Sequence, residues 1–201
     1  MFESNGLGAY FAEVARLEAA SVDAFRILRD ELRAHGAPKK LVRAAARAAR
    51  DEVRHTRATG ALARRFGARP RAPEVERGAP RSIEAMAIEN AVEGCVRETY
   101  GALLATWQAQ AARDSVVRAA MMRIARDETK HAALSWSVGR WLAARLDREQ
   151  KRRVERAKQA AAREILCAAE HDTAGFADVA GLPSAATAAR LAAEMQRALW
   201  S

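Results

Sequence analysis

The chain has few cysteines, few aromatic residues and no long apolar run. Its two cysteines, Cys95 and Cys167, lie far apart and form no C-x-x-C pair, which argues against a zinc knuckle, a rubredoxin-like iron site or a disulfide framework. Both are expected to be small buried thiols. No segment reads as a secretory signal, and none is long and apolar enough to span a bilayer. We therefore expect a cytoplasmic protein with no membrane contact.

Residues that favour β-strands are also scarce. Aromatic residues make up 5% of the chain, and valine and isoleucine are sparse, whereas alanine is the commonest residue. This composition favours helices over strands. A chain of 201 residues is long enough for one domain with a substantial core and too short for two ordinary domains. The composition therefore predicts an all-α protein of one domain.

Hydrophobic periodicity predicts the order of the helices. Gly36 and Pro38 mark a turn between the first two, and residues 68–80, which contain three prolines, predict a crossover to the third. Ser82 is a plausible N-cap for the third helix, and Asp114 or Ser115 for the fourth. Two hairpins with one crossover are the plan of a four-helix bundle, expected over residues 1–147. Residues 148–201 are expected to add one or two helices on the outside of the same domain. The predicted helices cover residues 9–34, 39–66, 82–112, 115–146 and 147–170, with a short last helix that ends near residue 200.

The net charge of +9 could attract nucleic acid or an acidic partner. Lys and Arg are spread along the helices among Asp and Glu and do not form one block. The charge pattern therefore favours a solvated surface over a nucleic-acid interface.

A repeated heptapeptide is the most informative feature of the sequence. Residues 49–55 read ARDEVRH and residues 125–131 read ARDETKH, so five of the seven letters agree. In each copy a Glu and a His lie three residues apart and point the same way from a helix. A single Glu-x-x-His is most often a solvated pair, but two copies on the second and fourth helices predict a metal cluster inside the bundle. These residues are Glu52, His55, Glu128 and His131.

Each half of such a cluster needs a further carboxylate. The first helix offers Glu18, which should face Glu52 across the hairpin. The third helix offers two candidates, Glu93 and Glu98. The offset of 75 from Glu18 to Glu93 nearly equals the repeat offset of 76 and favours Glu93, whereas symmetry about the second turn favours Glu98. We expect Glu93 to be the ligand and Glu98 to be an extra carboxylate that can swing onto the metal. His35 and His171 are left outside the predicted site.

In this order on four helices, the motifs resemble those of the di-iron carboxylate ferritin-like superfamily, which includes ferritins, rubrerythrins and di-iron oxygenases. The similarity covers residues 9–146. It implies that Glu52 and Glu128 bridge two metal ions, and that an acidic residue before each bridging glutamate orients a histidine. The implied pairs that complete the site are Glu18 with His55, Glu93 with His131, Asp51 with His131, and Asp127 with His55.

The resemblance implies two iron ions, or an iron–manganese pair, and three possible activities. The first is an O₂-activating oxidase or oxygenase that acts on a small substrate with an external reductant, as a monomer or a homodimer. The second is a ferroxidase, or a peroxidase that uses peroxide, although the lack of a C-x-x-C domain argues against a rubrerythrin and the +9 charge against a storage ferritin. The third is a tRNA-modifying di-iron hydroxylase. A helical protein without metal would leave the repeated heptapeptide unexplained.

Overall fold

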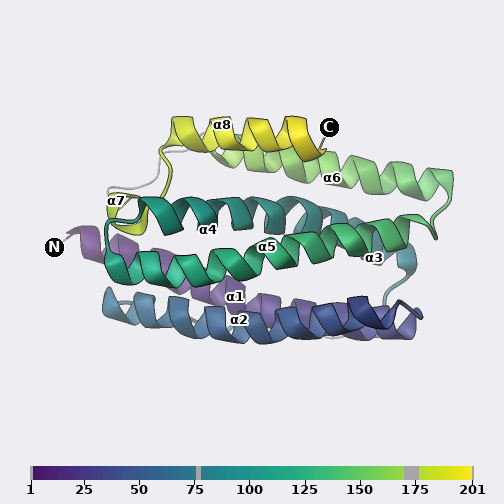
Figure 1. Ribbon diagram of the computed structural model, residues 1–201, viewed down its shortest axis with the longest axis horizontal. Helices are drawn as coiled ribbons and strands as arrows, with labels where there is room; N and C mark the ends of the chain where they lie inside the picture. Colours follow the sequence, from purple (N-terminus) through teal and green to yellow (C-terminus); the bar gives the residue numbers. More distant parts are fainter. Residues whose placement is uncertain (1, 76–77, 170–176, 201) are drawn as a thin grey trace.

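The computed structural model describes residues 2–75, 78–169 and 177–200, and every regular element among them is helical (Figure 1). The predicted all-α class is confirmed. Within these residues no helix combines the length and the apolar content needed to cross a membrane. His171 lies outside the described residues. In chain order the elements are α1 (Phe2–Ala34), α2 (Lys39–Arg65), α3 (Ile83–Glu89), the π-helix η1 (Asn90–Glu98), α4 (Thr99–Ala111), α5 (Ser115–Ala143), α6 (Arg148–Ala169), α7 (Ala177–Ala180), α8 (Ala185–Met195) and the π-helix η2 (Gln196–Trp200).

The helices turn where the sequence has local stop and start signals. Gly36 has a φ of 68°, and the N–H of Ala37 donates to the carbonyl of Leu32 at 2.8 Å, which is the Schellman ending of a helix. The side chain of Asp114 accepts hydrogen bonds from the backbone N–H groups of Val116 and Val117. Asp114, and not Ser115, is therefore the N-cap of α5. Figure 1 shows α1 running back along α2, and the α3–η1–α4 run back along α5.

Two apolar clusters of the core lie at opposite ends of the long helices. One contains Phe11 of α1 and Ile124 of α5, and the other contains Phe25 of α1 and Val138 of α5. Residues 16–24 of α1 and residues 126–133 of α5 separate the two clusters along the chain, and the middle of α2 does so in the same way. The core therefore leaves a stretch between its apolar ends in which polar side chains point inward.

The third long helix contains a π-helical segment that the sequence analysis did not predict. Asn90 starts η1, and its side-chain amide donates to the carbonyl of Ser135 on α5 at 3.0 Å. At the other end, the indole N–H of Trp200 donates to the carbonyl of Cys95 at 2.9 Å. π-Helices are uncommon and are frequently found at functional sites. Contacts from two other elements thus hold this segment in place.

The C-terminal helices cover η1. α6 packs against α3 and η1, and α8 packs against α6. Trp200 is fully buried in a cluster with Val96, Ala161 and Ala162. Of the two cysteines, Cys95 is buried as expected, whereas Cys167 is exposed, so the prediction of a buried thiol is wrong there. Cys167 lies in the last turn of α6.

Replacing Gly94 by alanine is expected to destabilise the protein by about 1–3 kcal/mol, because a Cβ atom there would lie 2.7 Å from the Cβ and Oγ atoms of Ser135. Gly101 is the matched control on the same long helix, since a Cβ atom there meets nothing within 4 Å. Gly101→Ala should stabilise the protein by about 0.5–1 kcal/mol. Urea unfolding of both variants measures the difference. Equal effects of the two substitutions would show that η1 does not pack closely on α5.

Candidate metal centre

Six acidic and histidine side chains from α1, α2, η1 and α5 meet in the stretch between the two apolar clusters. They form two groups, and in each group the potential ligand atoms lie within 4.8 Å of one another. Both groups contain Glu52 and Glu128, so the groups share two carboxylates. The first group is Glu18, Glu52, His55 and Glu128, and the second is Glu52, Glu98, Glu128 and His131.

These side chains are buried to a degree that is rare for acidic groups. Glu52 is 1% exposed and Glu128 is 8% exposed. Yet Glu52 Oε2, Glu98 Oε1, Glu128 Oε1 and the Nδ1 atoms of both histidines make no hydrogen bond. A buried polar atom without a partner costs about 1–3 kcal/mol or more. Bound cations would satisfy these atoms together, so the residues present fit a metal centre.

The inner nitrogens of the two histidines point at carboxylates of the neighbouring helix. His55 Nδ1 lies 3.0 Å from Glu128 Oε1, and His131 Nδ1 lies 2.9 Å from Glu52 Oε1. These distances are short, but the angles do not suit hydrogen bonds. Both Nδ1 atoms therefore have no hydrogen-bond partner. The donor atoms of α2 and α5 thus converge on common points between the helices and are not aligned with each other.

The outer nitrogens of the histidines face the two aspartates expected from the sequence. His131 Nε2 lies 3.4 Å from Asp51 Oδ2, and His55 Nε2 lies 3.6 Å from Asp127 Oδ2. An acidic partner on the outer nitrogen favours the tautomer that leaves Nδ1 open for a metal. Asp51 is within hydrogen-bonding distance of His131, whereas His55 Nε2 is near Asp127 but makes no hydrogen bond.

Arg54 joins these two aspartates and was missed by the sequence analysis. Its Nη2 atom lies 2.5 Å from Asp51 Oδ1 and 3.1 Å from Asp127 Oδ2. Lys130 has the equivalent place in the second heptapeptide and lies 2.7 Å from Asp127. The signal was present in the repeat, since both copies keep a basic residue three positions after the aspartate.

Burial and the crowding of charges shift the pKa values of the cluster. Burial lowers the pKa of His55 and of His131, but the neighbouring carboxylates, Glu128 foremost, outweigh it and raise both values to about 12. Burial raises the pKa of Glu98 to about 8, and it raises that of Glu18 well above its usual value. For Glu52, contacts with both histidines outweigh burial and lower the pKa to about 2. The metal-free cluster thus holds protons that a metal must displace.

On the third helix the structure brings Glu98 to the cluster and leaves Glu93 outside it. The side chain of Glu93 is 54% exposed and pairs with Arg97 at 2.6 Å, whereas Glu98 Oε1 lies 3.5 Å from His131 Nδ1. The expectation that Glu93 is the ligand is corrected. That expectation followed from the offset between Glu18 and Glu93, and η1 upsets such an offset because its hydrogen bonds span five residues and not four. Symmetry about the second turn favoured Glu98, which is the carboxylate that lies beside His131.

His35 lies away from the cluster, with its Nε2 atom 2.7 Å from the carbonyl of Arg81. Phe25, which the sequence analysis did not link to the site, packs its ring 5.0 Å from that of His131.

Comparison of the chain with protein-family models, with curated proteins and with solved structures finds no match.

Proposed function

We propose that this protein is a ferritin-like four-helix bundle that binds two iron ions and acts as an O₂-activating oxidase or oxygenase on a small substrate. In this proposal α1, α2, the α3–η1–α4 run and α5 are the four helices, and residues 66–82 are the crossover. The observation that carries the proposal is the pair of ligand groups that share Glu52 and Glu128.

The proposed ligands divide into a shared pair and two outer pairs. Glu52 and Glu128 would contact both ions. Glu18 with His55 would complete one ion, and Glu98 with His131 the other. Four ionised carboxylates carry the charge that two divalent cations balance, and oxygen-rich ligands with one imidazole per ion suit iron or manganese. When bound, such a redox-active pair would supply the electrons that reduce O₂.

The surrounding residues keep the ligands in place and the interior dry. Asp51 would hold the outer nitrogen of His131, Asp127 lies near that of His55, and Arg54 links the two aspartates. The apolar clusters at both ends shield the carboxylates from water, which strengthens their attraction for cations. This arrangement fixes the ligand atoms before a metal arrives.

Anaerobic reconstitution tests the proposal. The purified protein is incubated with ferrous iron, desalted and analysed for metal, and is then exposed to O₂ while absorption and O₂ consumption are followed. We expect two irons per chain and oxidation of both by O₂. Sustained O₂ consumption with added Fe²⁺ as the only reductant would favour a ferroxidase. Failure to retain iron would contradict the proposal.

Loading the metal-free protein with two divalent ions is expected to release about three protons per chain at pH 7. The sources are the two imidazolium groups, whose pKa values are about 12, and the carboxyl group of Glu98, whose pKa is about 8. Because protons compete with the metal, affinity should fall as the pH is lowered. A pH-stat titration with Zn²⁺ measures the release. Release of less than about one proton would contradict the predicted protonation of the cluster.

A further inference from the structure

The positive charge of α2 and α5 is not balanced by acidic residues outside the metal cluster. α2 carries nine Lys and Arg residues, and its only acidic residues are Asp51 and Glu52. α5 carries five, and its only acidic residues are Asp127 and Glu128. In contrast, α1 has six acidic residues and four arginines. The interpretation of the charge as a mixed, solvated surface therefore suits α1 but not α2 and α5, which pack against each other.

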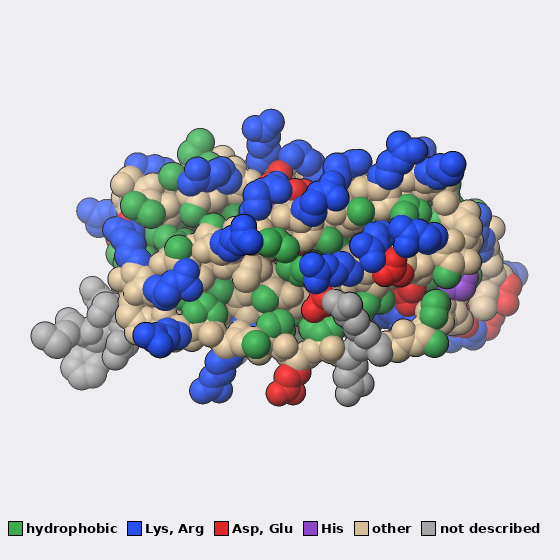
Figure 2. Space-filling view, turned by 90° about the horizontal axis from the view of Figure 1, so that it is seen from below, with side chains coloured by type: hydrophobic (Ala, Val, Ile, Leu, Met, Phe, Trp, Pro, Cys, Tyr) green, Lys and Arg blue, Asp and Glu red, His purple; other side chains and the backbone are tan. Residues whose placement is uncertain are grey.

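Five of the nine cations of α2 form a row along its outer face. Their spacing of three, four or seven residues places them on one side of the helix, which is about 40 Å long. These five are exposed and have no ion-pair partner among residues 2–75, 78–169 and 177–200, whereas Arg54 and Arg65 pair with aspartates. Figure 2 views the molecule from the side of α2, and Lys and Arg side chains far outnumber Asp and Glu there. The basic row consists of Lys40, Arg43, Arg47, Arg50 and Arg57.

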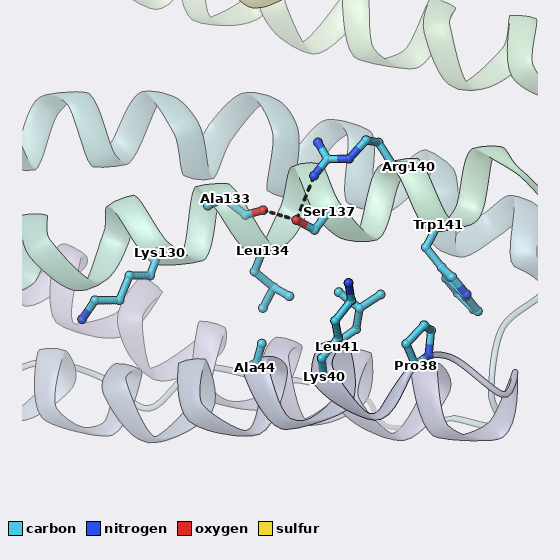
Figure 3. A pocket seen from close by; sticks show the side chains of 10 residues that line it. All are labelled: Pro38, Lys40, Leu41, Ala44, Lys130, Ala133, Leu134, Ser137, Arg140 and Trp141. Carbon is cyan, nitrogen blue, oxygen red and sulfur yellow. Dashed lines mark hydrogen bonds between the residues drawn. The ribbon is translucent and has the colours of Figure 1, made fainter.

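A groove between α2 and α5 lies beside one end of the basic row (Figure 3). Its volume is about 490 Å³. Leu41, Leu134 and Trp141 line its wall, and Lys40 and Arg140 lie at its rim. The indole N–H of Trp141 is buried and makes no hydrogen bond, and the guanidinium of Arg145 lies over the ring, 4.1 Å from its centroid. The groove therefore combines an aromatic ring, an apolar wall and cations.

We propose that this face binds a single-stranded nucleic acid, with its phosphates along the basic row and an unstacked base in the groove beside Trp141. Arginine makes up most of the row, and its planar group matches phosphate oxygens in pairs. Aromatic side chains stack on bases of single strands, which a duplex does not expose. This inference does not depend on the metal, because neither the row nor the groove includes a proposed ligand.

The exposed side chains of α2 argue against an anionic membrane as the partner. A helix that lies on a membrane inserts bulky apolar residues between the lipids. The large hydrophobic residues that are exposed in the described part of the chain are Leu17, Val116, Met122 and Leu199, and none belongs to α2. The basic row thus has the charge to attract phosphates but no side chains to anchor it in lipid.

Fluorescence anisotropy with a labelled RNA of about 20 nucleotides tests the proposal. Lys40→Gln, Arg43→Gln and Arg47→Gln together should weaken binding at least about tenfold and reduce the salt slope by about two. The matched control is Lys151→Gln, Arg156→Gln and Arg163→Gln on α6, which removes the same charge from exposed residues at the opposite side of the molecule (Figure 1). The control should weaken binding less than about twofold. Melting followed by circular dichroism verifies that both variants fold.

A second set of measurements tests the groove. Trp141→Leu keeps an apolar wall but removes the stacking surface, and it should weaken RNA binding about fivefold. A duplex of the same length should bind more weakly than the single strand. Equal losses in the two triple variants, equal binding of duplex and single strand, or binding only to vesicles of anionic phospholipid would each overturn the proposal. These results stand apart from the iron content, so a failure here leaves the metal centre untouched.

Discussion

Glu52→Gln and Glu128→Gln together are expected to reduce the bound iron from two ions per chain to almost none. Both side chains belong to both ligand groups, so their replacement removes donors from each ion at once. Glutamine keeps the shape of glutamate but is neutral, and its amide nitrogen does not bind iron. The cluster would lose half of its four carboxylates. Metal analysis after anaerobic reconstitution measures the loss. A double variant that retains both irons would contradict the proposed metal centre.

Two single variants on the third helix serve as a matched pair for this experiment. Glu98→Gln should lower the affinity for one of the two ions, because Glu98 lies in the second ligand group. Glu93→Gln should leave both ions in place, because the side chain of Glu93 is exposed and pairs with Arg97. The two residues lie in the same π-helix, so general disturbance of that helix affects both variants. Loss of iron in Glu93→Gln alone would restore the original expectation for the third helix.

The helices could be predicted because their limits depend on local signals. Gly36 and Pro38 end one helix and begin the next, and Asp114 caps α5 through its own neighbours in the chain. Such contacts are visible in a stretch of a few residues. The π-helix η1 could not be predicted in this way, since its anchors, Ser135 and Trp200, lie far away in the sequence.

In the candidate site, too, residues fixed by local spacing could be predicted and a residue placed by distant contacts could not. The repeat identified Glu52, His55, Glu128 and His131, because a shared spacing of three on two helices is a sequence pattern that the fold preserves. The choice between Glu93 and Glu98 depended on the phase of the third helix, which η1 alters. Phase is a property of the backbone that residue spacing alone does not reveal. The position of Glu98 therefore depends on the contacts that keep η1 in its π-helical form.

Trp200 is one of the contacts that the C-terminal helices provide to η1, and its replacement by alanine is expected to destabilise the protein by about 3–5 kcal/mol. The side chain is fully buried against Val96, Ala161 and Ala162, so alanine would leave a large cavity. Trp200→Phe keeps most of the packing and loses the hydrogen bond to the carbonyl of Cys95, which should cost about 1 kcal/mol plus the cost of a smaller cavity. Urea unfolding of the metal-free protein measures both values.

The same two variants show whether η1 connects the C-terminal helices to the proposed metal centre. Cys95 lies three residues before Glu98, so a π-helix that loosens at Cys95 would move the carboxylate that faces His131. Trp200→Ala should therefore weaken the binding of one ion, as Glu98→Gln is expected to do. The measurement is made without urea, and circular dichroism verifies that the variant is still helical. A stable Trp200→Ala variant that binds both irons normally would show that η1 holds its shape without the Trp200 contact. In that case the contacts of η1 with α5 and α6 would set the position of Glu98.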